Sequence, residues 1–395
     1  MSALKYWLWL SSMRGLGQTR AAALIDAFGS PENIYFAGED EWREAAELPE
    51  QAVRELQNKS TERAERILEL CERANTRILT MQDASYPERL RSLYAPPCVL
   101  YYKGQLPSFD EEAALAVVGT RNPTAYGQNT ALKLCYQLAA SGMLIVSGLA
   151  KGIDAAAHMG ALRAGKPTAA VLGCGTDVVY PAENRELYED IIAAGLLFSE
   201  YPPGTRAEGP HFPARNRIIS GLSLGVLVVE APPGSGALIT ASHALEQGRD
   251  VFAVPGPVGN RESEGCHRLI REGAILAAKA EDVSAEYQTL FPHKLTLAAP
   301  AAPAHMPRPA APAAETTRAL PEEPLKVIDL TERVKGYTPD QQRILLSIAK
   351  NAMVADEIIG VTGLPAPLAL SELTMLELDG IVTQVPGRRY TLNLT

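Results

Sequence analysis

The 395-residue chain has few cysteines, and none of them belongs to a recognisable pair. The five cysteines are dispersed, without a Cys-x-x-Cys motif and without histidines at zinc-ligand spacing. This pattern argues against a disulfide framework or a zinc site and predicts reduced core thiols in a cytoplasmic protein. The sequence also lacks an apolar run of the roughly 18 residues that a membrane-spanning helix needs. We therefore expect a cytoplasmic protein with no membrane contact and no metal.

Positive charge is also scarce, because 46 acidic residues outnumber 37 basic ones and the formal net charge is −9. Such a balance argues against a protein coated with basic patches. It does not exclude nucleic acid as a ligand, since the local field at a groove decides the contact. We expect any nucleic-acid site on this chain to be confined to a small area.

Several sequence signatures of catalysis are missing as well. The chain has no G-x-x-x-x-G-K-[ST] loop, no G-x-G-x-x-G fingerprint after a predicted strand, and no G-x-S-x-G elbow accompanied by a matching triad. ATP hydrolysis, dinucleotide binding and triad hydrolysis are therefore disfavoured. We expect no cofactor and no catalytic residue.

Changes in composition divide the chain into segments. Alanine and proline alternate between residues 298 and 324, which is typical of an extended tether. Turn-forming pairs such as Tyr86-Pro87 and Pro96-Pro97 mark a second boundary region. The predicted organisation is a helical domain at 1–80, a connector at 81–112, a central domain at 113–295, a linker at 296–325 and a terminal domain at 326–395.

In the central domain, short apolar runs alternate with amphipathic helical segments. Runs such as 114–118, 144–146 and 225–229 have the length and composition of buried strands. This alternation is typical of an α/β fold with a doubly wound parallel sheet that helices cover on both faces. After the linker, three predicted helices followed by a two-stranded turn at 381–392 indicate a winged-helix domain.

Glycines and polar residues follow several of the predicted strands. Open parallel sheets bind ligands at this edge, because loops and helix N-termini present backbone amides there. Asp154 is expected to hold the turn that precedes it. For each loop a plain structural explanation stays open, namely glycines that end strands and an arginine in a surface ion pair. The candidate binding residues in these loops are Gly119, Thr120, Arg121, Ser147, Gly148, Lys151, Gly152, Gly234, Ser235 and Gly236.

The segment 211–221 places Phe212, Arg215, Asn216 and Arg217 side by side before an apolar run. An aromatic ring can stack on a nucleobase, and guanidinium groups can hold phosphates. The alternative for the ring is a plug in the core. Two arginines and an amide in such a short segment favour the binding role.

Taken in order, these motifs resemble the motif series of the DprA/Smf family. The flanks agree, since Arg14-Gly15-Leu16-Gly17 and the helix after it resemble the family's helical SAM-like N-terminal domain, and the terminal domain resembles its winged-helix domain. The resemblance implies that the central domain is Rossmann-like. The motifs that carry it are 118–121, 147–154, 180–184, 212–221 and 234–240.

The resemblance implies a role in natural transformation. Such a protein binds incoming single-stranded DNA without catalysis, protects it, loads the recombinase RecA onto it, and forms a homodimer through the Rossmann-like domain. Carried onto this chain, Arg121, Arg215 and Arg217 would hold phosphates, and Phe212 would stack on a base. The turn at 147–154, Asn216 and the amides of 234–236 would complete the pocket.

The chain also departs from the family pattern. Glu208 stands in the stretch before the phenylalanine, where a basic side chain is often found, so the wider affinity for DNA is expected to depend on Arg185, Arg206 or Arg217. His267 occupies a position where the family usually has asparagine, and its role stays open.

Both flanking domains leave a choice of ligand. The turn Gly15-Leu16-Gly17 can present amides to a DNA phosphate or can be an ordinary interhelical turn. The third predicted helix of the terminal domain, at 366–373, has no Lys or Arg, and its wing has only Arg388 and Arg389. We therefore favour a protein contact over DNA binding for the terminal domain.

Two other classes of function remain open. The glycine loop after Glu230 is similar to the phosphate loops of lysine-decarboxylase-like enzymes, which cleave a ribose-phosphate from a nucleotide. The segment 233–237 lacks the Pro-Gly-Gly-x-Gly-Thr form that those enzymes use. The third class is a structural adaptor with a vestigial pocket.

Overall fold

The computed structural model describes residues 3–296, 337–348, 353–378, 381–385 and 389–392. The chain divides into two compact units, Met1–Pro307 and Arg308–Thr395. Most of the predicted linker at 296–325 and Arg388 of the predicted wing lie outside the described residues.

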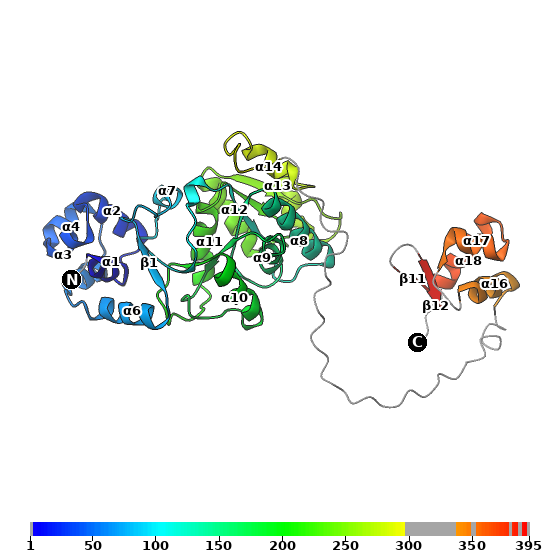
Figure 1. The fold of residues 1–395 in the computed structure, drawn as a ribbon, viewed down its shortest axis with the longest axis horizontal. Helices are drawn as coiled ribbons and strands as arrows, with labels where there is room; N and C mark the ends of the chain where they lie inside the picture. Colours follow the sequence, from blue (N-terminus) through cyan, green and yellow to red (C-terminus); the bar gives the residue numbers. More distant parts are fainter. Residues whose placement is uncertain (1–2, 297–336, 349–352, 379–380, 386–388, 393–395) are drawn as a thin grey trace, which may run out of the picture. The chain divides into compact units, whose positions relative to one another are not determined.

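The first unit begins with a helical segment, drawn in blue in Figure 1. Gly15 and Gly17 adopt φ angles of +77° and +74° in the turn after the first helix, a conformation that glycine adopts most readily. Leu16, between them, is buried, so this turn is anchored in the core of the segment. The helices are α1 (Leu4–Ser11), α2 (Gln18–Phe28), α3 (Pro31–Phe36), α4 (Glu39–Ala45), α5 (Glu50–Gln57) and α6 (Glu62–Arg73).

A nine-stranded sheet forms the centre of the unit, in the order β1-β2-β6-β5-β4-β3-β7-β8-β9. The strands from β6 to β9 in this order pair in parallel, whereas β1 and β2 add an antiparallel edge. The strands are β1 (Arg77–Thr80), β2 (Val99–Gly104), β3 (Ala114–Val118), β4 (Leu144–Ser147), β5 (Thr168–Leu172), β6 (Leu196–Ser199), β7 (Gly225–Val228), β8 (Asp250–Ala253) and β9 (Ile275–Leu276).

Helices cover both faces of this sheet, as the sequence predicted. Along β3, Ala116 and Val118 pack in one buried cluster with residues of α11 and α12, whereas Leu115 and Val117 pack in another with residues of α8 and α9. The alternation follows from the two-residue period of a strand. The helices are α7 (Glu88–Arg91), α8 (Ala125–Ala140), α9 (Ile153–Arg163), α10 (Arg185–Ala194), α11 (His211–Gly221), α12 (Gly236–Glu246), α13 (Glu264–Arg271) and α14 (Glu281–Tyr287), with the 3-10 turns η1 (Phe109–Glu111), η2 (Ala182–Asn184) and η3 (Arg261–Ser263).

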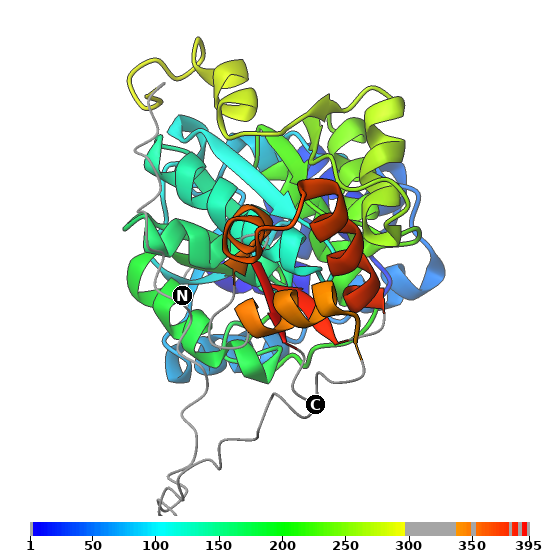
Figure 2. The ribbon, with the colours of Figure 1, turned by 90° about the vertical axis from the view of Figure 1, so that its right-hand side faces the viewer.

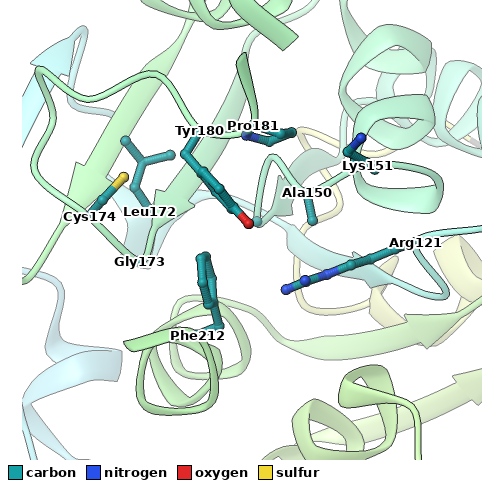
Figure 3. A pocket seen from close by; sticks show the side chains of 10 residues that line it. Arg121, Ala150, Lys151, Leu172, Gly173, Cys174, Tyr180, Pro181 and Phe212 are labelled. Carbon is teal, nitrogen blue, oxygen red and sulfur yellow. The ribbon is translucent and has the colours of Figure 1, made fainter. Parts of the chain in front are cut away.

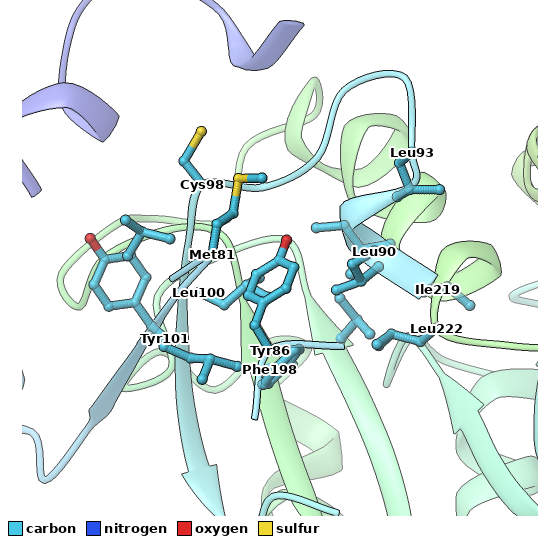
Figure 4. Packing of buried hydrophobic residues seen from close by; sticks show 14 of the residues in the cluster. Met81, Tyr86, Leu90, Leu93, Cys98, Leu100, Tyr101, Phe198, Ile219 and Leu222 are labelled. Atoms are coloured by element: carbon cyan, nitrogen blue, oxygen red, sulfur yellow. The ribbon is translucent and has the colours of Figure 1, made fainter. Parts of the chain in front are cut away.

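The antiparallel edge joins the segment before residue 113 to the sheet core. Tyr101 of β2 pairs with Ser199 of β6, and Leu90 and Leu93 lie beside Leu222 in a continuous apolar cluster (Figure 4). The segment predicted as a connector therefore supplies a strand to the sheet and a helical turn that packs on α11.

The second unit has the element order of a winged helix. Its strands form a three-stranded antiparallel sheet in the order β10-β12-β11. Its core includes Ile344, Ile358, Leu373 and Val382, which come from the three helices that the structure describes in this unit and from its hairpin. The elements, seen close together in Figure 2, are α16 (Pro339–Ile348), β10 (Met353–Val354), α17 (Ala355–Thr362), α18 (Ala366–Leu378), β11 (Val382–Val385) and β12 (Arg389–Leu392).

Across the described parts of both units, no helix combines the length and the apolar character that crossing a bilayer requires.

Candidate nucleic-acid interface

A groove opens where the parallel strands end. Strand β3 has β4 on one side and β7 on the other, so the chain order reverses beside it, and such a switch point is the usual ligand site of an open α/β sheet. The loops after β3, β4 and β7 and the start of α11 enclose a groove of about 600 Å³. A smaller pocket of about 40 Å³, which shares Arg121, Tyr180 and Phe212 with the groove, lies against the end of β5.

An arginine and two aromatic rings meet at the mouth of this groove (Figure 3). The guanidinium carbon of Arg121 lies 5.2 Å from the centroid of the Phe212 ring. The Tyr180 ring lies 5.3 Å from the same centroid, with 34° between the planes. Arg121 and Tyr180 are exposed, and Phe212 is partly exposed. A cation over an aromatic face is typical of sites that hold a phosphate and a base together.

Arg215 lines the groove but is buried beneath it. Its guanidinium donates to the carbonyl oxygens of Gly148, at 2.7 Å, and Val171, and to the amide oxygen of Asn216, at 3.2 Å. Burial lowers the pKa of Arg215, and the nearby Asp154 carboxylate opposes that shift. This arginine therefore joins the ends of β4 and β5 and keeps the groove in shape.

Asp154 is the acidic partner of this buried arginine. Burial raises the pKa of its carboxyl, and Arg215 is the first of the groups that oppose the shift. The carboxylate accepts a hydrogen bond from the Ala150 amide at 3.4 Å. Asp154 thus holds the turn between β4 and α9, which is the role the sequence suggested for it.

The turn between β4 and α9 brings several backbones close together. Leu149 adopts a φ of +54°, which a branched residue rarely takes, and the Asn184 side chain donates to its carbonyl at 3.0 Å. Gly152 has a φ of +78°, and a side chain there would place its Cβ 2.5 Å from the Thr120 carbonyl oxygen. The loop carrying Arg121 and the start of α9 can approach each other this closely only because residue 152 is glycine.

The loop that carries Arg121 is held in place by Glu230. This residue is buried at the end of β7, and its carboxylate accepts hydrogen bonds from the Thr124 amide, at 2.9 Å, and from the Thr124 hydroxyl. Glu230 was not among the predicted site residues. An acidic residue directly after an apolar strand was the signal that could have indicated its role.

Many of the residues predicted as a site come together here. Lys151, at the small pocket, is exposed and forms an ion pair with Glu183. The predicted residues that line the groove or the small pocket are Gly119, Thr120, Arg121, Gly148, Lys151, Phe212, Arg215, Asn216, Ser235 and Gly236.

Other predicted residues lie elsewhere. Arg217 does not accompany Arg215, because the segment is helix α11 and residues two apart in a helix point in directions roughly 200° apart. Arg217 instead pairs with Glu200 at 2.6 Å. Arg185 begins α10 and is exposed, but it lines neither the groove nor the small pocket. Ser147 donates to the Val117 carbonyl at 2.6 Å, inside the sheet.

Tyr180 and Asn184 were not predicted as individual site residues, although the segment 180–184 is one of the motifs that carry the family resemblance. A tyrosine directly before a proline in the loop after a predicted strand was the available signal. Gly234 lines neither cavity, although its neighbours Ser235 and Gly236 line the groove. His267, whose role was open, lies 3.0 Å through Nε2 from the Gly256 carbonyl oxygen, so it ties α13 to the loop after β8.

Over the described residues, no group of three or more histidine, cysteine, aspartate or glutamate side chains has the geometry to hold a metal ion. All five cysteines are buried and unpaired with one another.

The fold and the site define a class: a Rossmann-like protein with an arginine and aromatic groove at its switch point, followed by a winged-helix unit. The family model of DNA recombination-mediator protein A matches residues 77–288, and that of the DprA winged helix domain matches residues 306–388. The chain belongs to the DprA/Smf family, as its motifs predicted.

Individual relatives agree with this assignment. The chain is similar to Protein Smf of Synechocystis, with 36% identity over 400 residues, which cover 98% of both chains. It is 48% identical to the DNA processing protein DprA of Streptococcus pneumoniae over 206 residues, or 52% of this chain and 72% of that protein. An X-ray structure of the Streptococcus pneumoniae protein superposes with a TM-score of 0.64 at 37% identity, covering 72% of this chain and 99% of the other.

Proposed function

We propose that this chain is a non-catalytic single-stranded DNA-binding protein that acts as a recombination mediator. In this proposal it protects incoming DNA during natural transformation and loads RecA onto it. The observation that carries the proposal is the exposed Arg121 placed over the Phe212 ring at the mouth of an open groove. The description of the matching family as a DNA recombination mediator supports the same role.

A single strand suits this groove better than a duplex. Stacking on Phe212 or Tyr180 needs a base whose face is free, and only an unpaired strand offers one without unstacking a helix. Arg121 can hold an adjacent phosphate through its guanidinium fork. Because Arg215 is buried and donates to the Gly148 and Val171 carbonyl oxygens, the strand would meet one exposed arginine and a set of small residues. Recognition would then be largely independent of base sequence.

The proposed contacts can be divided by role. Arg121 and Phe212 bind the strand directly, and Tyr180 extends the stacking surface. Lys151 adds positive charge at the small pocket. Arg215 positions the loops around them from below. The other predicted residues that line the groove or the small pocket, Gly119, Thr120, Gly148, Asn216, Ser235 and Gly236, complete the proposed contact surface.

The proposal includes two protein partners and a compartment. A homodimer through the Rossmann-like domain and an interaction with RecA rest on the family to which the chain belongs. The winged-helix unit is proposed to contact protein, because α18 has no Lys or Arg. Five buried, unpaired thiols fit the reducing cytoplasm.

A salt-titrated binding assay tests the proposal. Fluorescence anisotropy with a labelled oligothymidylate should show binding that weakens with salt, and Arg121→Ala should cost about 1.5 to 3 kcal/mol of binding free energy. The logarithmic salt slope should fall in magnitude by about 0.7, the value for one phosphate contact on a single strand. Arg121→Lys should retain part of the salt slope but lose affinity, because it keeps the charge without the fork.

The matched control is Arg66→Ala, which removes an exposed arginine from α6, away from the groove. Equal affinities for Arg121→Ala and the parent protein, at equal folded fraction, would sink the proposal. Consumption of a mononucleotide by the parent protein would instead support the enzyme alternative, and the absence of both binding and turnover would support the adaptor.

A further inference from the structure

A second polar hollow lies at the far end of helix α12 from its N-terminus. It has a volume of about 370 Å³. Ser92, Leu93, Tyr94 and Ala95 form one wall, and the other is formed by Arg217, His243, Glu246, Gln247 and Arg249. Arg217, which does not line the groove, therefore lines this second hollow. We call this hollow the Tyr94 pocket.

Buried polar atoms in the Tyr94 pocket lack protein partners. Arg217 Nη1, Gln247 Oε1 and Arg249 Nε are all inaccessible at the surface and have no hydrogen-bond partner among the described residues. Buried polar atoms are nearly always bonded in folded proteins. Two donors and one acceptor without partners therefore belong to side chains that line the hollow, and rotation of these side chains would turn the unpaired atoms toward a polar ligand.

The pocket also presents an aromatic ring on a fixed support. Tyr94 is 88% exposed, whereas its neighbour Leu93 is buried. The side chain of Leu93, labelled in Figure 4, packs so close to α11 that a Cβ at Gly221 would lie 2.8 Å from it. The exposed Tyr94 ring is therefore attached to a backbone segment that is fixed by packing. This lowers the entropy that would be lost when the ring stacks on a ligand.

Charge in the pocket is nearly balanced. Glu200 pairs with Arg217 at 2.6 Å, and His243 lies 3.3 Å from Glu246. Glu246 and Arg249, which carry opposite charges, then leave the pocket with little net charge. We therefore expect ring stacking to contribute more than charge to binding here, and the salt dependence of that contribution to be small.

Helix α12 connects the Tyr94 pocket to the groove. Ile239 lines the groove and His243 lines the Tyr94 pocket, and residues four apart lie on the same face of a helix. From Ile239 to Glu246 the helix rises by roughly 10 Å. A strand of a few nucleotides spans that distance.

We propose that the Tyr94 pocket is a second contact for the same single strand, in which Tyr94 stacks on a base and Arg249, with Arg217 and Gln247, binds the adjoining phosphate and base edge. The inference rests on the proposed function and extends it. A strand that fills the groove continues along α12 and reaches Tyr94 only when it is long enough. The affinity of this protein for DNA then rises with strand length in a step that depends on Tyr94.

A length series tests this inference. Oligothymidylates of increasing length are titrated against the full chain, its Tyr94→Ala variant and its Tyr94→Phe variant. Tyr94→Ala should leave the affinity for the shortest binding oligomer unchanged and weaken the longer ones roughly tenfold, which corresponds to one stacked base. Tyr94→Phe should behave as the parent does, because the ring is kept.

The controls separate this inference from the proposed function. Phe36→Ala removes another strongly exposed ring, 73% accessible, from outside both cavities and should have no effect. Arg249→Gln should weaken only the longer oligomers. An identical profile for Tyr94→Ala and the parent, or an equal loss at every length, overturns the second contact. Failure of Arg121→Ala to weaken any oligomer overturns the groove itself.

Discussion

The rim of the central sheet and the third helix of the winged-helix unit both occupy positions where proteins often bind DNA, yet their chemistry is opposite. The rim exposes Arg121 beside aromatic rings. Helix α18 has no Lys or Arg, and it exposes Leu368, Leu370 and Met375. A phosphate chain would meet a cation at the first surface and apolar side chains at the second.

This difference shows that an element's place in a fold does not determine its ligand. A winged helix supplies a helix shaped for a groove of DNA, but binding free energy for nucleic acid comes largely from phosphate contacts. An exposed set of apolar side chains on one helix is more typical of a protein interface. The acidic chain thus keeps its cationic site small and local, at the sheet.

The largest effect on stability is expected from replacing Arg215, which is buried beneath the groove. Arg215→Met should cost about 3 to 5 kcal/mol of unfolding free energy, because it leaves the Gly148 and Val171 carbonyl oxygens without their donor and removes the positive charge that favours the buried Asp154 carboxylate. The measurement is the denaturant midpoint of the first unit. Arg121→Ala, at an exposed position, should stay within about 0.5 kcal/mol of the parent.

A double substitution checks the cause of that loss. Adding Asp154→Asn to Arg215→Met should restore part of the stability, since no charge then remains buried. An Arg215→Met protein with the parent's midpoint would show that the buried pair does not hold the groove.

Removing a side chain from each surface, Phe212 at the rim and Met375 on α18, tests the difference between them. Phe212→Ala should lose about 1 to 3 kcal/mol of single-strand binding free energy, the value of one base on an aromatic ring. Met375→Ala, on α18, should leave that affinity unchanged. Anisotropy titrations of both variants against one oligothymidylate make the comparison, and an equal loss from both would contradict the assignment of DNA to the rim.

Acid should weaken the first unit through His158. Burial, with a smaller effect of Arg215, lowers the pKa of His158 to about 3. Because its folded pKa lies below its unfolded value near 6.5, the stabilisation is complete above about pH 6.5 and declines at about 1.4 kcal/mol per pH unit as the pH falls toward the folded pKa. Residues 337–395 contain no histidine, so the second unit lacks this contribution.

Unfolding midpoints at pH 7.5 and 5.5 for the parent and His158→Gln measure this effect. The raised carboxyl pKa values of Asp154 and Glu200 act in the opposite sense, with stability lost as the pH rises through the folded pKa. The difference between the two proteins therefore isolates the histidine. An unchanged slope in the variant would assign the pH dependence to other groups.

The smallest effect is expected from removing the winged-helix unit. Deletion of residues 326–395 should leave most single-strand affinity intact, because the proposed contacts lie in the first unit. Anisotropy titration with the labelled oligothymidylate measures the affinity of the truncated protein. Loss of most of the affinity would place DNA contacts on the second unit after all.

Several features of the candidate site were predictable from local sequence. Arg121 and the glycines of its loop follow an apolar run, and strand ends in a parallel sheet meet at one edge, so their convergence could be expected. Arg217 could not be placed in this way. Its separation from Arg215 depends on the segment being helical, and proline and glycine near Phe212 suggested a turn. Tyr180 was not predicted because it follows a different strand from Phe212. The two side chains come close together only in the folded chain.

The order of residues alone determined the family, the doubly wound sheet and the winged helix, because these depend on periodicity and motif spacing. Only the tertiary structure decided which arginine faces the solvent and which is buried against Asp154. A side chain's role is set by the distance to groups far away in the chain and by its access to water, and neither quantity is encoded by its immediate neighbours.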